Sequence, residues 1–175
     1  MIIDFRNNSH LITGPLLARW KSVGATDILF TLHHPDHFTD VYLRSLLPLV
    51  DEIRIHGLRP GFYTGLLGLE KQETITKYGL QNYLQVDSHK SIIRYDNWLP
   101  GCCPNTDYVK HYRLPLLKKA ISILKMETIY FAFPWFLKNA CYCDNCINML
   151  TQHFARCGSH DPESIPLLHY RTTKF

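Results

Sequence analysis

The stretch Thr26–Leu32, with the sequence TDILFTL, decides the fold. It is a short run of β-branched and aromatic residues, which is typical of a buried strand. A helical pattern follows from about Phe38 to His56 and stops at Gly57, and Pro48 inside it should kink or divide the helix. The order strand, turn, helix predicts one β-α unit.

The same unit recurs along the chain. We expect strands at Met1–Phe5, Thr26–Leu32, Arg59–Thr64 and Glu127–Phe133, and helices at Leu16–Val23, 38–56, Asp107–Lys125 and Cys146–Cys157. Four consecutive β-α units predict an α/β fold with a parallel sheet and right-handed crossovers. Since a closed (β/α)₈ barrel takes about 250 residues, the chain is expected to form a half or partial TIM-type barrel, a fragment of one, or a small open sheet.

One connection is much longer than the others. Residues 65–106 form this third loop, and it contains a predicted hairpin of Tyr83–Asp87 and Ser91–Tyr95. A connection of this length in an α/β protein is usually functional. We expect one partial barrel domain at 1–158 and an irregular C-terminal tail at 159–175.

Composition excludes several classes of protein. The chain has 175 residues, of which 46% are hydrophobic and 19% charged, as in a globular protein with one core. Its apolar runs are too short for a membrane span of roughly 20 residues. A formal charge of +4 without a basic cluster argues against nucleic acid as a partner. The N-terminus lacks the pattern of a signal peptide, so we expect a cytoplasmic protein.

The cysteines are crowded rather than spread as in a disulfide framework. Cys141, Cys143 and Cys146 form the motif CYCDNC, and Cys102 and Cys103 are adjacent at the end of the third loop. Three thiolates leave one vacancy in a tetrahedral site, which Cys103 or Cys102 could fill. A closed site of four sulfur ligands suits structural Zn²⁺. The alternative is a set of reduced thiols without a metal.

These motifs resemble a known family of enzymes. The segment Cys103-Pro104-Asn105, followed by a helix, a strand and the CYCDNC motif, is similar to the TIM-barrel glycoside hydrolases, namely the family 42 β-galactosidases and a less characterised set of related glycosyl hydrolases. The resemblance covers only the first half of the barrel. It implies a structural zinc near the active site, held by Cys103 (or Cys102), Cys141, Cys143 and Cys146, and a carbohydrate ligand.

The sequence departs from this family at the end of the fourth strand. Ala132 stands where the resemblance implies a carboxylate. Glycoside hydrolysis normally requires two carboxyl groups, one on each side of the bond. The acids nearest other strand ends, Asp4 and Asp36, are the remaining catalytic candidates, and we expect no efficient hydrolysis by this chain alone.

Other polar and aromatic residues follow the predicted strands and are candidates for substrate binding. They are Arg6, His33, His34, Tyr63, Trp98 and Trp135. Aromatic rings offer flat faces on which sugars stack, although core packing is the alternative for each ring. The run His33-His34-Pro35-Asp36-His37 could also bind a metal, or form a loop in which Asp36 caps the next helix.

Two further hypotheses do not require activity. The chain could be a catalytically inert carbohydrate-binding module, or a zinc-stapled module that completes its barrel as a homodimer. The second follows from the inner face of an open curved sheet, which would be wet in a monomer. We expect this face to carry residues from the set Ile3, Phe5, Leu29, Thr31, Phe62, Phe131 and Phe133.

Overall fold

The computed structural model describes residues 2–5, 12–67, 71–95, 99–132 and 141–157. The chain forms two compact units, which are Met1–Gly68 with Lys110–Pro134, and Leu69–Val109 with Trp135–Phe175. The expected tail lies outside the described residues, so the boundary at residue 158 stays a prediction. Within the described ranges, no helix is both long enough and apolar enough to span a membrane.

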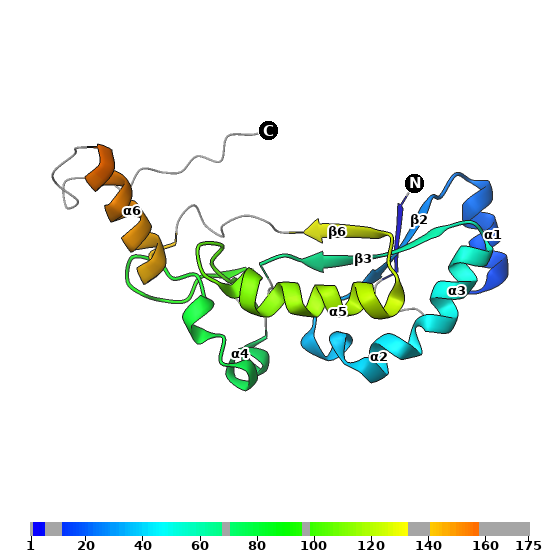
Figure 1. Ribbon diagram of the computed structural model, residues 1–175, viewed down its shortest axis with the longest axis horizontal. Helices are drawn as coiled ribbons and strands as arrows, with labels where there is room; N and C mark the ends of the chain where they lie inside the picture. The colour runs from blue at the N-terminus through cyan, green and yellow to red at the C-terminus, as the bar shows by residue number, and fades with distance from the viewer. Residues whose placement is uncertain (1, 6–11, 68–70, 96–98, 133–140, 158–175) are drawn as a thin grey trace. The chain divides into compact units, whose positions relative to one another are not determined.

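The first unit contains a sheet of four parallel strands (Figure 1). In spatial order they are β1 (Ile2–Phe5), β2 (Asp27–Thr31), β3 (Arg59–Gly65) and β6 (Thr128–Ala132). Each strand pairs in parallel with its neighbour. The carboxyl ends of the strands therefore meet at one edge of the sheet, which we call the carboxyl edge.

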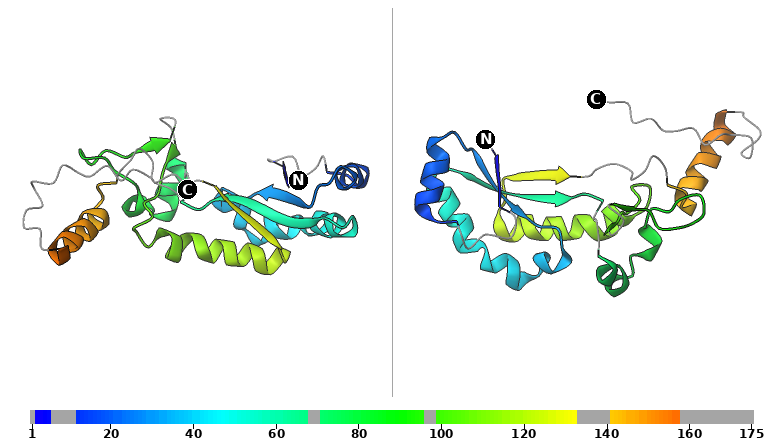
Figure 2. Two further views of the ribbon diagram at one scale, coloured as in Figure 1. Left: turned by 90° about the horizontal axis from the view of Figure 1, so that it is seen from above. Right: turned by 180° about the vertical axis from the view of Figure 1, so that it is seen from behind.

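Short helices connect these strands. They are α1 (Gly14–Ser22), α2 (Asp40–Ser45), α3 (Leu47–Ile55) and α5 (Leu114–Leu124), with a 3₁₀ turn at Pro35–Phe38 and a π-helix at Tyr108–Arg113 before α5. Pro48 lies in the first turn of α3, so the helix predicted at 38–56 is divided as expected. Figure 2 shows α2, α3 and α5 on the same side of the strands.

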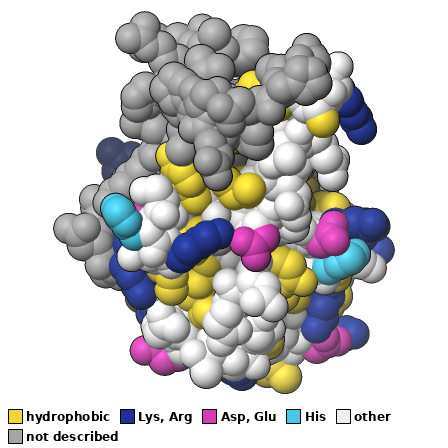
Figure 3. All heavy atoms as spheres, turned by 90° about the vertical axis from the view of Figure 1, so that its left-hand side faces the viewer, with side chains coloured by type: hydrophobic (Ala, Val, Ile, Leu, Met, Phe, Trp, Pro, Cys, Tyr) yellow, Lys and Arg dark blue, Asp and Glu magenta, His cyan; other side chains and the backbone are white. Residues whose placement is uncertain are grey.

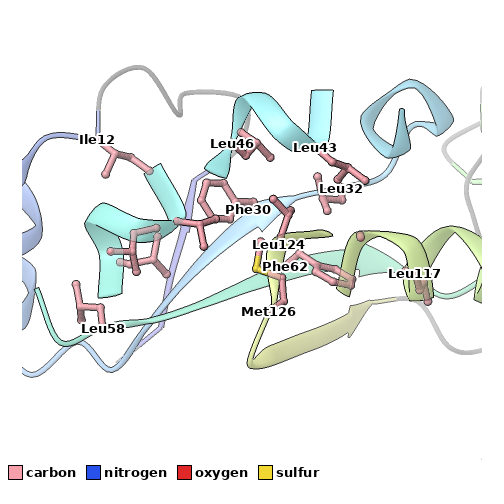
Figure 4. Packing of buried hydrophobic residues seen from close by; sticks show 14 of the residues in the cluster. Ile12, Phe30, Leu32, Leu43, Leu46, Leu58, Phe62, Leu117, Leu124 and Met126 are labelled. Atoms are coloured by element: carbon pink, nitrogen blue, oxygen red, sulfur yellow. The ribbon is translucent and has the colours of Figure 1, made fainter. Parts of the chain in front are cut away.

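The core lies between these helices and one face of the sheet (Figure 4). Phe30 and Phe62 are register partners on neighbouring strands, and both side chains are buried in this core. Leu117 and Leu124 pack against it from α5. Because each side chain of this size contributes about 1.5–3 kcal/mol when it is fully buried, this contact orients the sheet and fixes which residues face away from the helices.

The opposite face of the sheet differs from the expectation in part. Leu29 and Thr31 alternate with the core residues of β2 and lie on this face as expected. Phe62 was expected there and is instead in the core, while Tyr63 takes the inner position. The apolar pattern could not determine which residues of β3 face the core, because Phe62 and Tyr63 are adjacent and either ring suits a core.

The remaining inner-face candidates are placed less completely. Phe131 is the register partner of Thr64, which lies on the same face of β3 as Phe62, so Phe131 is not an inner-face residue either. The side chains of Ile3 and Phe5, and all of Phe133, lie outside the described residues. The mixed α/β class with a parallel sheet is as predicted. Helix α6 belongs to the second unit, so four successive β-α units are not established and the half barrel stays a prediction.

The second unit contains the third loop and the last helix. Its elements are α4 (Gln72–Tyr78), a 3₁₀ turn at Gln81–Tyr83, β4 (Arg94–Tyr95), β5 (Leu99–Pro100) and α6 (Asp144–Cys157). The predicted hairpin is present as an antiparallel bridge between Val86 and Ile92, closed by a hydrogen bond from the Asp87 amide to the Ser91 carbonyl. Helix α4 was not predicted.

A buried arginine organises the carboxyl edge in the first unit. Arg113 is fully buried at the start of α5, and its guanidinium donates to the carbonyl oxygens of His33 and Gly65, at 3.1 Å each, and to Thr64 Oγ1. The same guanidinium lies 5.3 Å from the centre of the Phe38 ring. Arg113 therefore joins α5 to the ends of β2 and β3.

A buried aspartate organises the opposite end of the strands. Asp27 is 3% exposed and accepts hydrogen bonds from Thr26 Oγ1 at 2.6 Å, Arg59 Nη2 at 2.9 Å and Thr128 Oγ1 at 2.8 Å. Burial alone would raise the pKa of Asp27, but these hydrogen bonds outweigh burial and hold the pKa below its usual value. Asp27 thus ties β2 to β3 and β6.

Replacing Asp27 by Asn should lower the free energy of unfolding by about 2 kcal/mol at neutral pH, because it removes hydrogen bonds to a charged acceptor. The folded pKa lies below the unfolded value of about 3.9, so the contribution is complete above that value and is lost as the pH falls through the folded pKa. Urea unfolding measured at neutral and at decreasing acidic pH should show parent and Asp27→Asn converging in acid.

The control for this series is Asp51→Asn. Asp51 is 67% exposed and its ion pair with Arg54 spans 3.5 Å, so we expect a change within about 0.5 kcal/mol. A difference between parent and Asp27→Asn that does not depend on pH would contradict the role of the Asp27 charge.

Candidate functional site

Four cysteines of the second unit come together in space. The sulfur atoms of Cys103, Cys141, Cys143 and Cys146 all lie within 4.8 Å of one another. The Cys103 sulfur is 3.3 Å from that of Cys146 and 3.6 Å from that of Cys143, too far for a disulfide bond of about 2.05 Å. Four sulfurs bound to one ion at about 2.3 Å would stand about 3.8 Å apart. The cluster is therefore of the size that one metal ion requires.

Of the two adjacent cysteines, the structure brings Cys103 into the cluster. Cys102 is fully buried but is not part of it. Its backbone forms a β-bridge with Leu84, and its carbonyl oxygen accepts a hydrogen bond from Gln85 Nε2 at 2.9 Å. Because neighbouring residues in an extended segment point to opposite sides, only one of the two thiols can face the other cysteines.

The local backbone prepares these sulfurs to act as ligands. The amide of Asn105 hydrogen-bonds to the Cys103 sulfur, and the amide of Cys143 does the same for Cys141. In both turns the donor is the second residue after the cysteine. Asn105 Nδ2 also donates to the Cys146 sulfur at 3.4 Å. Such donors stabilise thiolates and orient the sulfur ligands without binding the metal themselves.

Helix α6 adds to this effect. Cys143 precedes the helix, and its carbonyl accepts the amide of Ile147 at 3.0 Å, while Cys146 lies in the first turn. The N-terminus of a helix carries partial positive charge, which favours thiolates. Two of the four ligand candidates are thus placed by one helix end.

The protons of the cluster are unevenly shared. Hydrogen bonds from Cys103 and Cys146 lower the pKa of Cys141 to about 2, although burial opposes the shift. The same hydrogen bond to Cys141 raises the pKa of the Cys103 thiol. Without a cation the cluster therefore favours one thiolate with neighbouring thiols donating to it, and a divalent ion would displace those protons.

The hairpin of the third loop supports the cysteine segment. The Tyr142 amide donates to the Val86 carbonyl at 2.8 Å, and Lys90 Nζ donates to the Tyr142 carbonyl and to Asp144 Oδ1 at 2.9 Å each. Lys90 adopts a positive φ of 61°, which is uncommon for a residue with a side chain. The hairpin turn and the CYCDNC segment are thus joined by direct hydrogen bonds.

The carboxyl edge of the sheet holds a second group of candidate residues. The centres of the His33 and Tyr63 rings are 5.2 Å apart, and the Tyr63 ring stacks on that of Tyr130 with 5.8 Å between ring centres. The Gly65 amide donates to His33 Nδ1 at 3.0 Å, which places the proton of a neutral His33 ring on Nε2. We call His33, Tyr63 and Tyr130 the aromatic row. It brings together two of the predicted substrate-binding residues.

Tyr130 was not among the predicted site residues. It is the register partner of Tyr63 and is 51% exposed. The strand pattern of residues 127–133 could have indicated it, because alternation places Tyr130 and Ala132 on the same face. Asn105, Lys90 and Arg113 were also missed, since nothing in their local sequence marks them.

Two other described candidates, His34 and Asp36, contact each other. His34 Nδ1 accepts from the Asp36 amide at 3.3 Å and lies 3.2 Å from the Asp36 carboxylate. Asp36 does not cap the next helix, because Thr39 Oγ1 accepts the Tyr42 amide and caps α2. In the described ranges, the four cysteines are the only group of three or more metal-ligating side chains, so the histidine run does not form one.

Several expectations fall on residues that are not fully described. Arg6, Trp98 and Trp135 lie outside the described residues, as does the side chain of Asp4, whose backbone pairs with Leu29. Ala132 pairs with Gly65 at the end of β6. At the position where the resemblance implies a carboxylate, the last residue of β6 therefore carries a methyl group.

Protein purified without added metal should carry about one equivalent of a divalent metal ion, because four sulfurs are in place to hold it. Cys143→Ser should release most of this metal and destabilise the third loop, since metal binding energy contributes to folding. Metal analysis and thiol titration measure both effects. Cys102→Ala is the matched control and should retain the metal. A folded parent that is free of metal, with all four thiols reactive, would exclude the centre.

Comparison with known proteins supports the fold alone. No protein-family model and no curated protein matches the chain. An α-galactosidase from Lactobacillus brevis aligns with a TM-score of 0.50 and 12% identity, over 89% of this chain. An α-galactosidase from Thermus thermophilus in complex with p-nitrophenyl α-D-galactopyranoside aligns with a TM-score of 0.46 and 15% identity, over 70% of this chain.

The chain spans only about a quarter of each of these two enzymes, 25% and 28% of their respective lengths. The alignment with the L. brevis α-galactosidase agrees, at the level of the fold, with the broader resemblance seen in the sequence. The finer resemblance to family 42 and its zinc is not part of this similarity and stays a prediction. The chain is thus similar in fold to part of a TIM-barrel glycoside hydrolase.

Proposed function

We propose that this chain is a glycoside hydrolase-like domain that is stapled by a structural zinc ion, binds carbohydrate at the carboxyl edge and does not hydrolyse glycosides alone. The observation that carries the proposal is the carboxyl edge itself. It presents the aromatic row beside a strand that ends in Ala132. The fold similarity to the L. brevis enzyme supports the class of domain.

Zinc is the metal that best suits the four cysteines. A closed set of four thiolates with no open position is typical of structural zinc, which has no redox chemistry. Cys103 would supply one ligand from the third loop, and Cys141, Cys143 and Cys146 would supply three from the segment before and within α6. When bound, the ion would contribute folding energy by joining these two segments.

Sugar binding is assigned to the exposed end of the aromatic row. Tyr130 is half exposed and stacks on Tyr63, which in turn contacts His33. A stacked pair presents a rigid apolar face beside polar groups, as sugar rings require. Arg113 positions this row indirectly, because it holds the carbonyl of His33, whose ring contacts Tyr63, and that of Gly65, two residues after Tyr63 in β3.

The same edge explains why hydrolysis is not expected. Glycosidases place two carboxyl groups about 5–5.5 Å apart, or about 6.5–9.5 Å apart in inverting enzymes. Among the described side chains, β3 ends in Gly65 and β6 in Ala132, and Asp36 is engaged with His34. A pair of carboxylates is not available from these groups.

The test combines hydrolysis with binding. We expect the parent protein to show no turnover of p-nitrophenyl galactosides above the uncatalysed rate. Tyr130→Ala should bind galactose about fivefold more weakly than the parent, because an aromatic stacking contact contributes about 0.5–1.5 kcal/mol. Tyr78→Ala is the matched control, since Tyr78 is 40% exposed on α4. Turnover at ordinary enzyme rates would contradict the proposal, as would galactose binding that Tyr130→Ala leaves unchanged.

Self-association is a second candidate property, favoured by the exposure of β6. This strand is the last in the sheet order, and its Tyr130 and Phe131 are 51% and 42% exposed on alternate sides. An edge strand with exposed rings is a ready partner for a second copy. Sedimentation at micromolar concentration should show a dimer that Phe131→Lys dissociates. A parent that remains a monomer of 20.4 kDa would exclude it.

A further inference from the structure

The second unit contains a hollow that the proposed function does not use. Its volume is about 440 Å³, within the range of small-molecule pockets. Its polar lining consists of Gln81, Asn82, Lys90, Asp107, Asp144 and Asn145. Tyr83, which is half buried and packs against Tyr108 at 5.9 Å between ring centres, adds an aromatic ring.

The hollow has two walls that are distant in sequence. One wall is residues 81–90 of the third loop, and the other is Cys143-Asp144-Asn145 at the start of α6. The walls are joined by the hydrogen bonds of Lys90 and Tyr142 and by the cysteine cluster. Because Cys143 belongs to both the lining and the cluster, an ion held by the cysteines would fix one wall against the other.

The lining indicates a neutral ligand with many hydroxyl groups. The side-chain amides of Asn82 and Asn145 can each donate and accept hydrogen bonds, and carboxylates accept from hydroxyls. Lys90 Nζ is paired with Asp144 at 2.9 Å, so these two charges offset each other, and the Asp107 carboxylate adds an acceptor for hydroxyl groups to the lining. Among the side chains that Figure 3 colours by type, acidic, basic and uncharged groups are interspersed.

We propose that this hollow is a saccharide-binding site, separate from the carboxyl edge, that requires a metal ion on the four cysteines. The proposal rests on the metal centre of the proposed function and is independent of its carboxyl-edge site. Asn145 is a binding residue, positioned by the same helix end that places Cys143 and Cys146. Tyr83 supplies the stacking face.

The experiment uses the full chain with its metal content measured, and maltose, cellobiose and lactose as probes in ligand-observed saturation-transfer NMR. Asn145→Ala should weaken binding of the responding disaccharide about tenfold with metal retained. Asn148→Ala is the matched control, because Asn148 is exposed one turn later in α6 and does not line the hollow. It should bind as the parent does. Removal of the metal by a chelator should abolish the signal from this site.

Two outcomes would overturn the proposal. A signal lost in Tyr130→Ala and kept in Asn145→Ala would place the sugar at the carboxyl edge, which leaves the proposed function intact and excludes the hollow. No signal for any disaccharide with metal-loaded protein would exclude a saccharide site here, while metal analysis of the same sample separately tests the cysteine centre. A signal that survives complete metal removal in the Tyr130→Ala variant, in which the carboxyl-edge site is weakened, would overturn the requirement for the ion.

Discussion

The buried guanidinium of Arg113 is the interaction on which the sheet unit depends. A guanidinium without water is tolerated only if its donors are matched, and here they meet two carbonyls and a hydroxyl at the ends of β2 and β3. Thr64 links this interaction to β2, because its hydroxyl also donates to the Leu32 carbonyl at 2.6 Å. One side chain thereby fixes the strand ends, and with them the rings of His33 and Tyr63.

In the second unit, the group that must be matched is negative rather than positive. Its crowded sulfurs favour negative charge, and amides, the end of α6 and the side chain of Asn105 are all directed at them. A cation on the cysteines would join the third loop to the start of α6 and so contribute to the folding of this unit.

Much of this arrangement could be predicted from local sequence. The strands at 27–31 and 59–65, the division of the helix at Pro48 and the hairpin around residue 89 all follow from periodicity and turn chemistry. Arg113 could not be predicted, because the π-helix at Tyr108–Arg113 changes the phase of the helical pattern just before it. The core position of Phe62 depends on strand register, which is a property of the assembled sheet, whereas the alternation in residues 127–133 could have indicated Tyr130.

Cys102 and Cys103 are adjacent in the sequence, but their thiols lie in different surroundings in the second unit. Both thiols are fully buried, but Cys103 belongs to the cluster that would hold an ion, whereas Cys102 lies outside that cluster and its backbone is bridged to Leu84. Pulsed alkylation resolved at single residues would thus time two processes on neighbouring atoms. Modification of Cys103 would follow loss of the ion, and modification of Cys102 would follow local unfolding of the backbone. The order in which the two thiols react would therefore show whether the ion leaves before or after this segment unfolds.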